Sequence, residues 1–378
     1  MKNNLLLIFA VLFLSCKGES EKGSSPKPTE AELVEIKYAE GFSIESYEGY
    51  KVLIVKDPWP DANQIYRYLL VEDEAKVPAD LKFEHKIKIP VENIVVTSTT
   101  HIPSLEVLES EEKLIGFPGL DYVSSQKTRN RIESGEITEL GKNEAINTEI
   151  LIASNPDLVI GFAVNGNNKT YNTLKRAGIL VIFNGDWTEN SPLGKAEWIK
   201  FFGALFNKSK EAEEYFIRVE INYQAAKTLA KAAEEKPVVL SGSMYKEQWY
   251  VPYGNSWLAQ FIEDSNASYI YKDTEGSGSI ALAFETVLSD AQNADYWVAP
   301  GQFISFEQLQ EASHHYEQFK AVTSKNVFTY ANTKGETGGV IFYEQAPNRP
   351  DLVLKDLISI FHPSLLPDYE RTFFKPLD

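Results

Sequence analysis

The sequence is poor in cysteine and histidine. Cys16 is the only cysteine among 378 residues, so no disulfide can form within the chain. The body that follows it has no thiol, which excludes thiol chemistry there. The five histidines are scattered, and only His314 and His315 are neighbours. A receptor for a bare zinc or manganese ion needs several His, Asp and Glu ligands that converge, so the sequence disfavours that function.

Positive charge is also short. The chain has 37 Lys and Arg against 54 Asp and Glu, which gives a formal net charge of -17. A protein that binds a nucleic-acid backbone needs a basic face, and attraction to anionic lipid needs charge of the same sign. The composition therefore argues against nucleic acid as a partner and against a purely electrostatic hold on a membrane. It is neutral about small ligands.

The short motifs of common enzymes are missing as well. The chain has no Gly-x-Ser-x-Gly elbow, no phosphate-loop glycine pattern and no His-Glu-x-x-His. The Gly-Ser-Gly-Ser stretch at 276–279 is too short and isolated to be a nucleotide fingerprint. We therefore expect a binding protein rather than an enzyme, with no resident cofactor.

The one long apolar run, Leu5 to Leu14, is too short to span a bilayer and has the length of a signal-peptide core. Ser15 and Cys16 follow it, which resembles a bacterial lipobox. We predict a signal peptide at 1–15, lipidation of Cys16 and a lipid-anchored flexible tether over 16–32. The alternative is an ordinary signal peptide followed by a chance cysteine. An exported, envelope-bound protein follows, with the choice between periplasmic face and cell surface left open.

The rest of the chain reads as strands and helices in a repeating order. Residues 33–90 have short period-two runs separated by Gly, Pro and Asp, which predict a β-rich extension. From Val91 onward, continuous apolar strands such as 157–161 and 179–183 alternate with helical segments. This alternation predicts βα units with a parallel sheet. The same pattern restarts at Pro237.

Between the two patterned parts, residues 191–236 are predicted to be helical. Ser191 and Pro192 give a helix start, and a break is expected near 207–209. The helix that follows has apolar residues at three-four spacing, so one face is buried. At about 1.5 Å per residue it would be roughly 40 Å long. The fold class is therefore α/β, with two βα lobes of mostly parallel sheet (33–190 with the extension, and 237–378) joined by one long α-helix.

Three stretches then point to a family. Residues 147–160 place a helix with one glutamate before a Pro-Asp-Leu-Val strand start, and 282–298 are similar in the second lobe. Residues 349–363 look like the family's closing helix. Taken in this order, the stretches resemble the helical-backbone substrate-binding proteins of ABC importers, which carry vitamin B12, ferric siderophores and haem. The resemblance covers roughly residues 91–362.

The resemblance implies that one glutamate on each lobe docks onto arginines of the permease dimer. The matching positions are Glu149 and Glu285. A carboxylate on arginine is an oriented, bidentate contact, and one anchor per lobe would set a rigid body in register on a two-fold transporter. The alternative for each residue is a solvated glutamate on a helix face. The protein itself is expected to act as a monomer.

The resemblance also places the ligand in the cleft between the lobes, at loops that follow strand ends. We expect these loops at 98–101, 117–122, 162–167 and 184–187 in lobe one, and at 244–255, 275–279, 301–306 and 332–339 in lobe two. The candidate contacts are Ser98, Thr100, His101, Phe117, Phe162, Trp187, Tyr245, Trp249, Tyr250 and Phe303. For each aromatic residue the alternative is core packing. For His101, which would reach a metal centre or a propionate, the alternative is an ordinary polar loop residue.

Cationic residues are sparse in these loops, so a strongly anionic ferric catecholate fits less well than a hydroxamate complex or a corrinoid. The sequence thus predicts the substrate-binding component of an ABC importer. It would capture an iron chelate of siderophore type or a corrinoid and deliver it to the permease. The alternative is a surface lipoprotein of the same fold that hands such a ligand over without an ABC permease.

Overall fold

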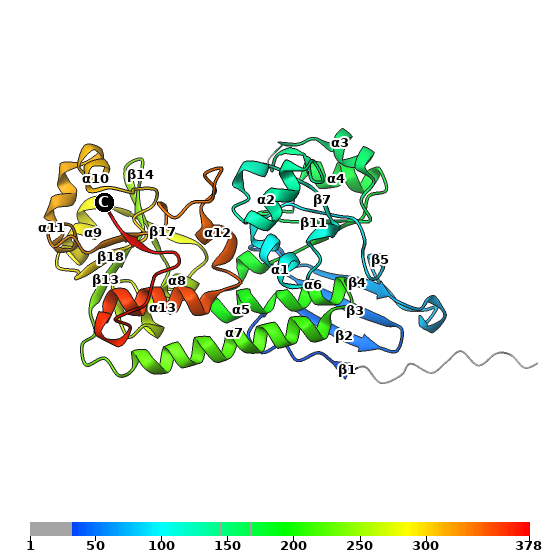
Figure 1. Cartoon of the computed structure of the whole chain (residues 1–378), viewed down its shortest axis with the longest axis horizontal. Coiled ribbons are helices and arrows are strands. Elements are labelled where there is room, and N and C mark those ends of the chain that lie inside the picture. The colour runs from blue at the N-terminus through cyan, green and yellow to red at the C-terminus, as the bar shows by residue number, and fades with distance from the viewer. Residues whose placement is uncertain (1–31, 144, 167) are drawn as a thin grey trace, which may run out of the picture.

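The computed structural model of the chain describes residues 32–143, 145–166 and 168–378. The predicted signal peptide, Cys16 and all but the last residue of the tether lie outside these residues. The described part has two lobes that stand side by side on a layer of helices (Figure 1). This confirms the predicted fold class, including the β-rich extension on the first lobe.

The extension is a five-stranded sheet beneath lobe one (Figure 1). Its strands are β1 (Glu32–Leu33), β2 (Phe42–Tyr47), β3 (Tyr50–Lys56), β4 (Ile65–Val71) and β5 (His85–Lys88). The first four are antiparallel, and β5 pairs parallel with β4. Alternate residues such as Leu53 and Tyr68 pack into the main core, while Val52 and Leu69 form a smaller cluster on the other face. Both faces of this sheet are therefore buried.

Lobe one is built on a parallel sheet of five strands. In sheet order they are β12 (Val181–Phe183), β11 (Leu158–Gly161), β6 (Ile94–Val96), β7 (Leu114–Phe117) and β8 (Thr138–Glu139). Its helices are α1 (Ile102–Val107), α2 (Gln126–Glu133), α3 (Thr148–Ser154) and α4 (Lys169–Arg176), and a short hairpin joins β9 (Gly141–Lys142) to β10 (Ala145–Ile146). The four strands β12, β11, β6 and β7 are apolar runs because helices and loops cover both faces, whereas the edge strand β8 is polar and exposed.

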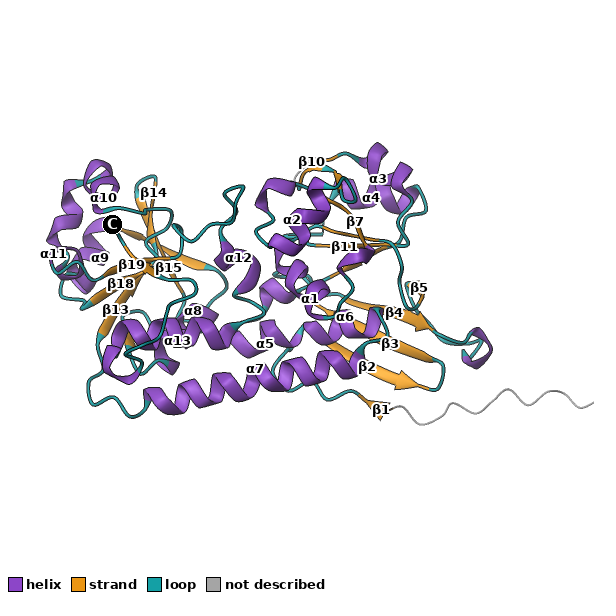
Figure 2. Ribbon diagram, in the orientation of Figure 1, coloured by secondary structure: helices purple, strands orange, loops and turns teal. Residues whose placement is uncertain are grey.

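The connecting region contains three helices, α5 (Pro192–Glu197), α6 (Ile199–Leu205) and α7 (Ser209–Ala230). The long helix α7 buries Ala212, Phe216, Val219, Tyr223 and Ala226, which is the predicted stripe. It has 22 residues, so it is about 33 Å long rather than 40 Å. With α5, α6 and α13 (Pro350–Phe361) it forms the layer of helices under both lobes (Figure 2).

Lobe two has a second five-stranded sheet, parallel except for its last strand. In sheet order its strands are β16 (Ser268–Tyr269), β13 (Val238–Ser241), β18 (Tyr296–Val298), β19 (Val327–Thr329) and β20 (Lys375–Pro376). Its helices are α8 (Trp257–Asp264), α9 (Phe284–Ala291), α10 (Phe306–Ala312), α11 (Lys320–Thr323), α12 (Ile341–Gln345) and α13 (Pro350–Phe361). Within the described ranges, no helix has both the length and the apolar character needed to cross a membrane.

A small antiparallel sheet of lobe two differs from the prediction. It consists of β14 (Ser243–Tyr245), β15 (Gln248–Pro252) and β17 (Ser279–Ala283). We expected residues 244–255 and 275–279 to be loops at the cleft. Instead, β15 alternates exposed and buried side chains, with Trp249 and Val251 pointing into the core of the lobe. The period of two, which we used elsewhere to find strands, was present here as well.

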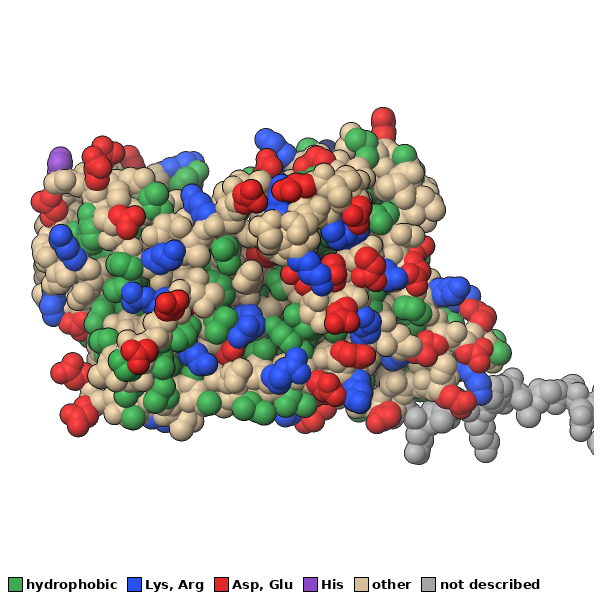
Figure 3. Space-filling view, in the orientation of Figure 1, with side chains coloured by type: hydrophobic (Ala, Val, Ile, Leu, Met, Phe, Trp, Pro, Cys, Tyr) green, Lys and Arg blue, Asp and Glu red, His purple; other side chains and the backbone are tan. Residues whose placement is uncertain are grey.

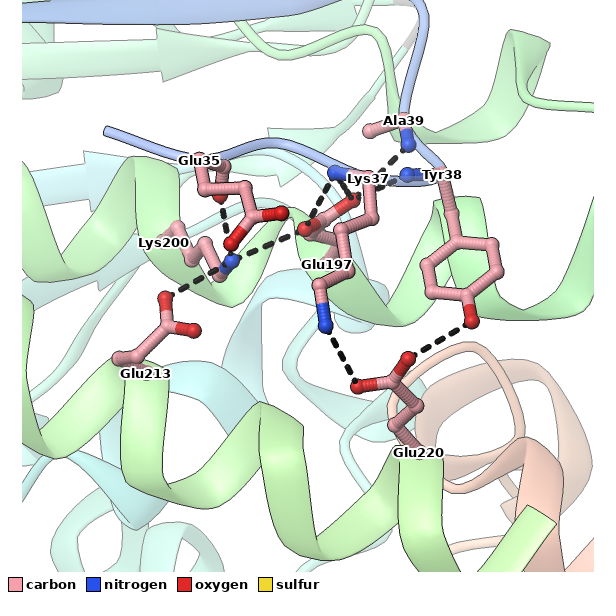
Figure 4. A network of polar contacts seen from close by, with 8 residues as sticks. All are labelled: Glu35, Lys37, Tyr38, Ala39, Glu197, Lys200, Glu213 and Glu220. Carbon is pink, nitrogen blue, oxygen red and sulfur yellow. Dashed lines mark hydrogen bonds and ion pairs between the residues drawn. The ribbon is translucent and has the colours of Figure 1, made fainter. Parts of the chain in front are cut away.

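An N-terminal strap, residues 34–41, is fastened to the connecting helices by carboxylates (Figure 4). Glu197 of α5 is fully buried and accepts hydrogen bonds from the backbone N–H groups of Lys37, Tyr38 and Ala39 at 2.7–3.0 Å. Lys200 of α6 donates to Glu197 at 2.9 Å and also to the carbonyl oxygen of Glu35 at 2.7 Å. We call the strap and the side chains of Glu197, Lys200, Glu213 and Glu220 that hold it the clamp. Glu197 and Lys200, the charged groups at its centre, both have partners.

Candidate functional site

Two neighbouring cavities lie between the lobes, where the space-filling view shows a notch on the side away from α7 (Figure 3). The first, which we call the floor cavity, encloses about 300 Å³. It is lined by Thr100, Asp186 and Trp187 of lobe one, Lys195 of α5, and Trp257, Leu258, Tyr330, Phe342, Tyr343 and Pro347 of lobe two. The second, the side cavity, encloses about 490 Å³ and shares Tyr343 with the first.

Most of the lobe-one lining comes from loops at the carboxyl ends of parallel strands. Ser98 follows β6, Phe162 follows β11, and Asp186 follows β12, while Phe117 is the last residue of β7. In an open α/β sheet these strand ends meet at one edge, which is why ligands bind there. Five of the predicted contacts are brought together in this way: Thr100 and Trp187 line the floor cavity, and Ser98, Phe117 and Phe162 line the side cavity. Their role as ligand contacts stays a prediction.

His101 is placed differently from what we expected. It is 0 % exposed, its ring lies 5.4 Å from that of Phe202, and it lines neither cavity. Burial lowers the pKa of the His101 imidazole, so the ring is neutral at neutral pH. A residue at the turn after β6 can point toward the cleft or back toward the connecting helices, and His101 does the second.

Four other predicted contacts also lie away from the two cavities. Trp249 is 0 % exposed and packs against Trp297, with 5.0 Å between ring centroids, so it is a core residue. Tyr245 and Tyr250 are exposed on the β14–β15 hairpin. Phe303 packs against Tyr316 in the core of lobe two. The hairpin, which we did not predict, is the reason three of these aromatic side chains face elsewhere.

The structure adds cavity residues that were not among the predicted contacts. Lys195 lies in a segment we treated only as a connector, and Trp257 begins α8. Tyr330, Phe342 and Tyr343 flank a loop that we expected at the cleft over 332–339. Asp186 was within an expected cleft loop, 184–187, yet we chose only its neighbour Trp187. A carboxylate directly after a predicted strand was the available signal.

The polar groups at the bottom of the floor cavity are unevenly paired. Asp186 is 6 % exposed, and its Oδ2 accepts a hydrogen bond from Thr100 Oγ1 at 2.9 Å. Its Oδ1 is buried and has no partner, and the same holds for the indole Nε1 of Trp187. Buried polar atoms are almost always hydrogen-bonded in proteins. Both atoms are enclosed by the protein, so the polar groups that Asp186 and Trp187 leave unpaired are not presented to the cavity.

Lys195 holds this loop in place from below. Its Nζ donates to the carbonyl oxygens of Asp186 at 3.0 Å and of Trp187 at 2.9 Å. The ammonium also lies 5.2 Å from the centroid of the Trp257 ring, within reach of a cation–π contact. Burial lowers the pKa of Lys195 to about 8, so the side chain is still mostly charged at pH 7.

A segment of lobe two reaches across to lobe one beside the cavities. We call residues 334–344 the latch. Glu344 accepts hydrogen bonds from the backbone N–H groups of Ser124 at 2.7 Å and Ser125 at 2.9 Å. Gly339 comes so close that an added Cβ would lie 2.3 Å from the carbonyl oxygen of Tyr122. The lobes are therefore in contact along one side of the cleft.

Glu149 and Glu285 are both exposed, in the first turns of α3 and α9. Neither has a polar partner among the described residues. One lies on each lobe, as the docking prediction requires, but this position is also that of any solvated glutamate. Their role stays a prediction.

The described residues contain no group of three or more His, Cys, Asp or Glu side chains arranged to hold a metal ion. The floor cavity itself presents one carboxylate, no histidine and no cysteine. What it can do is bind an organic group, through aromatic walls and a few polar atoms at one end.

Comparisons with known proteins agree with this geometry. Residues 94–333 match the family model of periplasmic binding proteins. An uncharacterized lipoprotein of Methanocaldococcus jannaschii is 31% identical over 297 residues, which cover 76% of this chain and 69% of that protein.

Solved structures share the fold at low sequence identity. A possible iron-binding, periplasmic solute-binding protein of Staphylococcus epidermidis has a TM-score of 0.58 at 18% identity, covering 72% of this chain and 99% of its own. A protein of an Fe3+-hydroxamate transport system of Saccharomonospora viridis has a TM-score of 0.54 at 16% identity, covering 72% and 94%. Haem-binding and vitamin B12-binding proteins are also among the matches.

Proposed function

The chain belongs to the periplasmic binding protein family, and we propose that it is the substrate-binding component of an ABC importer, with a metal chelate as its cargo. The cargo would be an iron complex of siderophore type or a corrinoid. The observation that carries this proposal is the floor cavity, because its walls come from both lobes and half of its lining residues are aromatic. A cavity of that kind takes an organic ligand, and opening of the lobes would release it.

The structural relatives support a chelate as the cargo. Their names refer to iron, an Fe3+-hydroxamate, haem and vitamin B12. In the last three the metal is carried by an organic ligand. The donor set of the floor cavity agrees, since a protein-held transition-metal ion needs several converging ligands and this cavity has a single carboxylate.

Attachment to a membrane and to a permease completes the proposal. A lipidated Cys16 would keep the protein at the cell envelope, and a curated relative is a lipoprotein. Glu149 and Glu285 would contact arginines of the permease, one from each lobe. The tether between the anchor and the strap would let the folded body reach the transporter.

A titration of the purified protein tests the cargo. The probes are a ferric trihydroxamate, a corrinoid, a ferric tricatecholate, haem and free Zn2+, and the signal is tryptophan fluorescence, since Trp187 and Trp257 line the floor cavity. We expect saturable quenching by a chelate at micromolar concentration or below. Haem and corrinoids absorb light, so calorimetry repeats those titrations. Binding of free Zn2+ alone, or of no probe, would contradict the proposal.

A second experiment tests the permease partner. Glu149→Ala and Glu285→Ala should leave chelate affinity unchanged, because both side chains are exposed and lie outside the cavities. In cells that carry the permease, we expect uptake to fall with either change and to fall further with both. Glu307→Ala changes another exposed glutamate in the first turn of a lobe-two helix, α10, and is the matched control. Undiminished uptake in the double variant would favour the surface lipoprotein that hands cargo over without a permease.

A further inference from the structure

The latch joins the lobes through a carboxylate of lobe two that is bound by lobe one. Both oxygens of Glu344 accept hydrogen bonds from backbone N–H groups, Oε2 from Ser124 at 2.7 Å and Oε1 from Ser125 at 2.9 Å. Glu344 is only 1% exposed. It is therefore a buried group whose surroundings exist only while the two lobes are in contact.

A second carboxylate, from lobe one, reaches the same point. Glu106 of α1 accepts a hydrogen bond from the hydroxyl group of Ser125, the residue whose N–H is bound to Glu344. One serine thus holds a carboxyl group from each lobe. Two charged carboxylates so placed repel each other, and burial adds to the cost of charging Glu344. Burial and Glu106 raise the pKa of Glu344 to about 7, against the opposing effect of the two hydrogen bonds.

Among the described residues, no cation pairs with Glu344 to offset this repulsion. Glu344 lies on α12, which packs against α1 and against the short turn Thr99–His101. His101 on that turn is buried and neutral. The other charged groups on the surrounding segments are bound elsewhere or exposed: Lys127 pairs with Glu111, Arg131 with Glu136 and Arg129 with the carbonyl oxygen of Leu120, while Asp121, Lys334 and Glu336 are exposed.

The segment that Glu344 fastens also forms walls of both cavities. Tyr343 lines the two of them, and Phe342 lines the floor cavity. Asn348 joins the lobes as well, through Ser104 at 2.9 Å, but that contact is uncharged and does not depend on pH. Release of Glu344 would therefore detach the latch from lobe one and open the cavities on that side.

We propose that Glu344 and Glu106 form a pH-sensitive clasp between the lobes, closed while Glu344 carries a proton and opened when both carboxyl groups are charged. In an open cleft Glu344 is in water, where its pKa returns to the ordinary value of 4.5. The closed state therefore binds more protons than the open state between pH 4.5 and about 7. The proton's contribution to closure is complete below pH 4.5 and is lost as pH rises through 7. If the proposed function holds, cargo is bound more firmly at acidic pH.

The test measures the distance between the lobes in the full chain without cargo, so it does not depend on the proposed function. Cys16→Ser removes the natural thiol. Spin labels are attached at Glu133→Cys on α2 and Glu311→Cys on α10, which are exposed positions on different lobes. Double electron–electron resonance spectroscopy then gives the distances between the labels at pH 5 and pH 8. Glu336→Gln, which changes an exposed glutamate of the latch, is the control.

We expect a single short distance at pH 5 and an additional, longer distance at pH 8. Glu344→Gln carries no charge at this position and should keep the short distance at both pH values. Glu106→Gln removes the repulsion and should raise the pH at which the longer distance appears. Glu344→Ala removes both hydrogen bonds and should show the longer distance at pH 5 as well, whereas Glu336→Gln should behave like the unaltered protein.

The same distance at pH 5 and pH 8 in the unaltered protein would overturn the inference, and so would a pH dependence that survives in Glu344→Gln. A ferric trihydroxamate or a corrinoid that binds in the titration above tests the consequence for cargo. Its affinity should be about tenfold higher at pH 5 than at pH 8, and this difference should be absent from Glu344→Gln. Failure of every chelate to bind would contradict the proposed function and leave the clasp standing, since the distances are measured without cargo.

Discussion

Glu197 and Asp186 are both buried carboxylates beside the connecting helices, but their oxygens are satisfied to different degrees. Glu197 is bound by three consecutive backbone N–H groups of the strap and by the ammonium of Lys200 (Figure 4). Asp186 lines a cavity, and it has one paired oxygen and one enclosed oxygen without a partner. The first arrangement is complete without a ligand and therefore serves the fold. The second leaves one enclosed oxygen without a partner, so the hydrogen bonds of Asp186 repay only part of the cost of its burial.

The largest effect is expected at the strap. Glu197→Ala leaves the ammonium of Lys200 and three N–H groups without their buried partner, so the free energy of unfolding should fall by about 3–5 kcal/mol. Urea denaturation measures this, and Glu197→Gln provides a milder variant if the alanine form does not fold. Glu213→Ala is the control, since Glu213 also pairs with Lys200 but its side chain is 37% exposed. If Glu197→Ala and Glu213→Ala lowered the free energy of unfolding equally, the number of hydrogen bonds to the buried carboxylate would not determine its contribution to stability.

A third buried carboxylate, Glu344 of the latch, extends the comparison to a group that has hydrogen bonds but no cationic partner. It accepts hydrogen bonds from two backbone N–H groups, whereas Glu197 accepts from three, and it has Glu106 nearby in place of a cation. Burial, opposed in part by those hydrogen bonds and reinforced by Glu106, raises the pKa of Glu344 from 4.5 to about 7. Since the folded pKa is raised, the folded state binds more protons than the unfolded state between these values. Its contribution to stability is complete below pH 4.5 and is lost as pH rises through 7.

Glu344→Gln tests that assignment, because glutamine resembles the protonated carboxyl at every pH. Urea denaturation at pH 5 should give similar stabilities for the two proteins. At pH 8 the glutamine form should be more stable, by up to about 3 kcal/mol. A difference between the two proteins that stays constant from pH 5 to pH 8 would contradict the raised pKa.

Asp186→Ala should behave in the opposite way to Glu197→Ala. Only one oxygen of this buried carboxylate is hydrogen-bonded, so the bonds it makes do not repay the cost of removing it from water. Its loss should therefore change the free energy of unfolding by about 1 kcal/mol or less. Thermal unfolding without cargo measures the effect. A large loss of stability at Asp186 would make it a structural residue like Glu197.

The smallest effect is expected at the edge of the clamp. Glu220 accepts hydrogen bonds from Tyr38 at 2.7 Å and Lys37 at 3.4 Å, and the Lys37 side chain is 39% exposed. Glu220→Gln should lower the free energy of unfolding by less than about 1 kcal/mol. Urea denaturation beside Glu197→Ala gives the comparison within one network. A loss as large as that of Glu197 would mean that the clamp acts as a single unit.

Much of the fold was predictable because its signals are local. The continuous apolar strands at 158–161 and 181–183 and the buried stripe of α7 follow from periodicity alone. The site was predictable only in part. Loops after strands could be assigned to the cleft, and this identified residues such as Ser98, Phe117 and Trp187.

The other residues of the site could not be predicted, because their positions depend on contacts between segments that are distant in the sequence. Lys195 faces the cavity because of how α5 lies against the loop of Asp186, and nothing in its own segment indicates this. Tyr330 and Phe342 stack with 4.2 Å between ring centroids because the loop that joins them, residues 331–341, turns back on itself. Trp249 was different, since its alternating neighbours marked it as an inward-facing strand residue. The unpaired atoms of Asp186 and Trp187 could be recognised only once the surrounding side chains were in place.

The most direct test of a cargo site between the lobes is hydrogen–deuterium exchange of the protein with and without a chelate that titrates. We expect slower exchange at residues 98–101, 184–187 and 341–347 when the chelate is bound, because these segments line or flank the cavities. The strap at 37–39 should exchange slowly in both states, since its amides are already bound to Glu197. Protection confined to a surface outside the cleft would contradict the account.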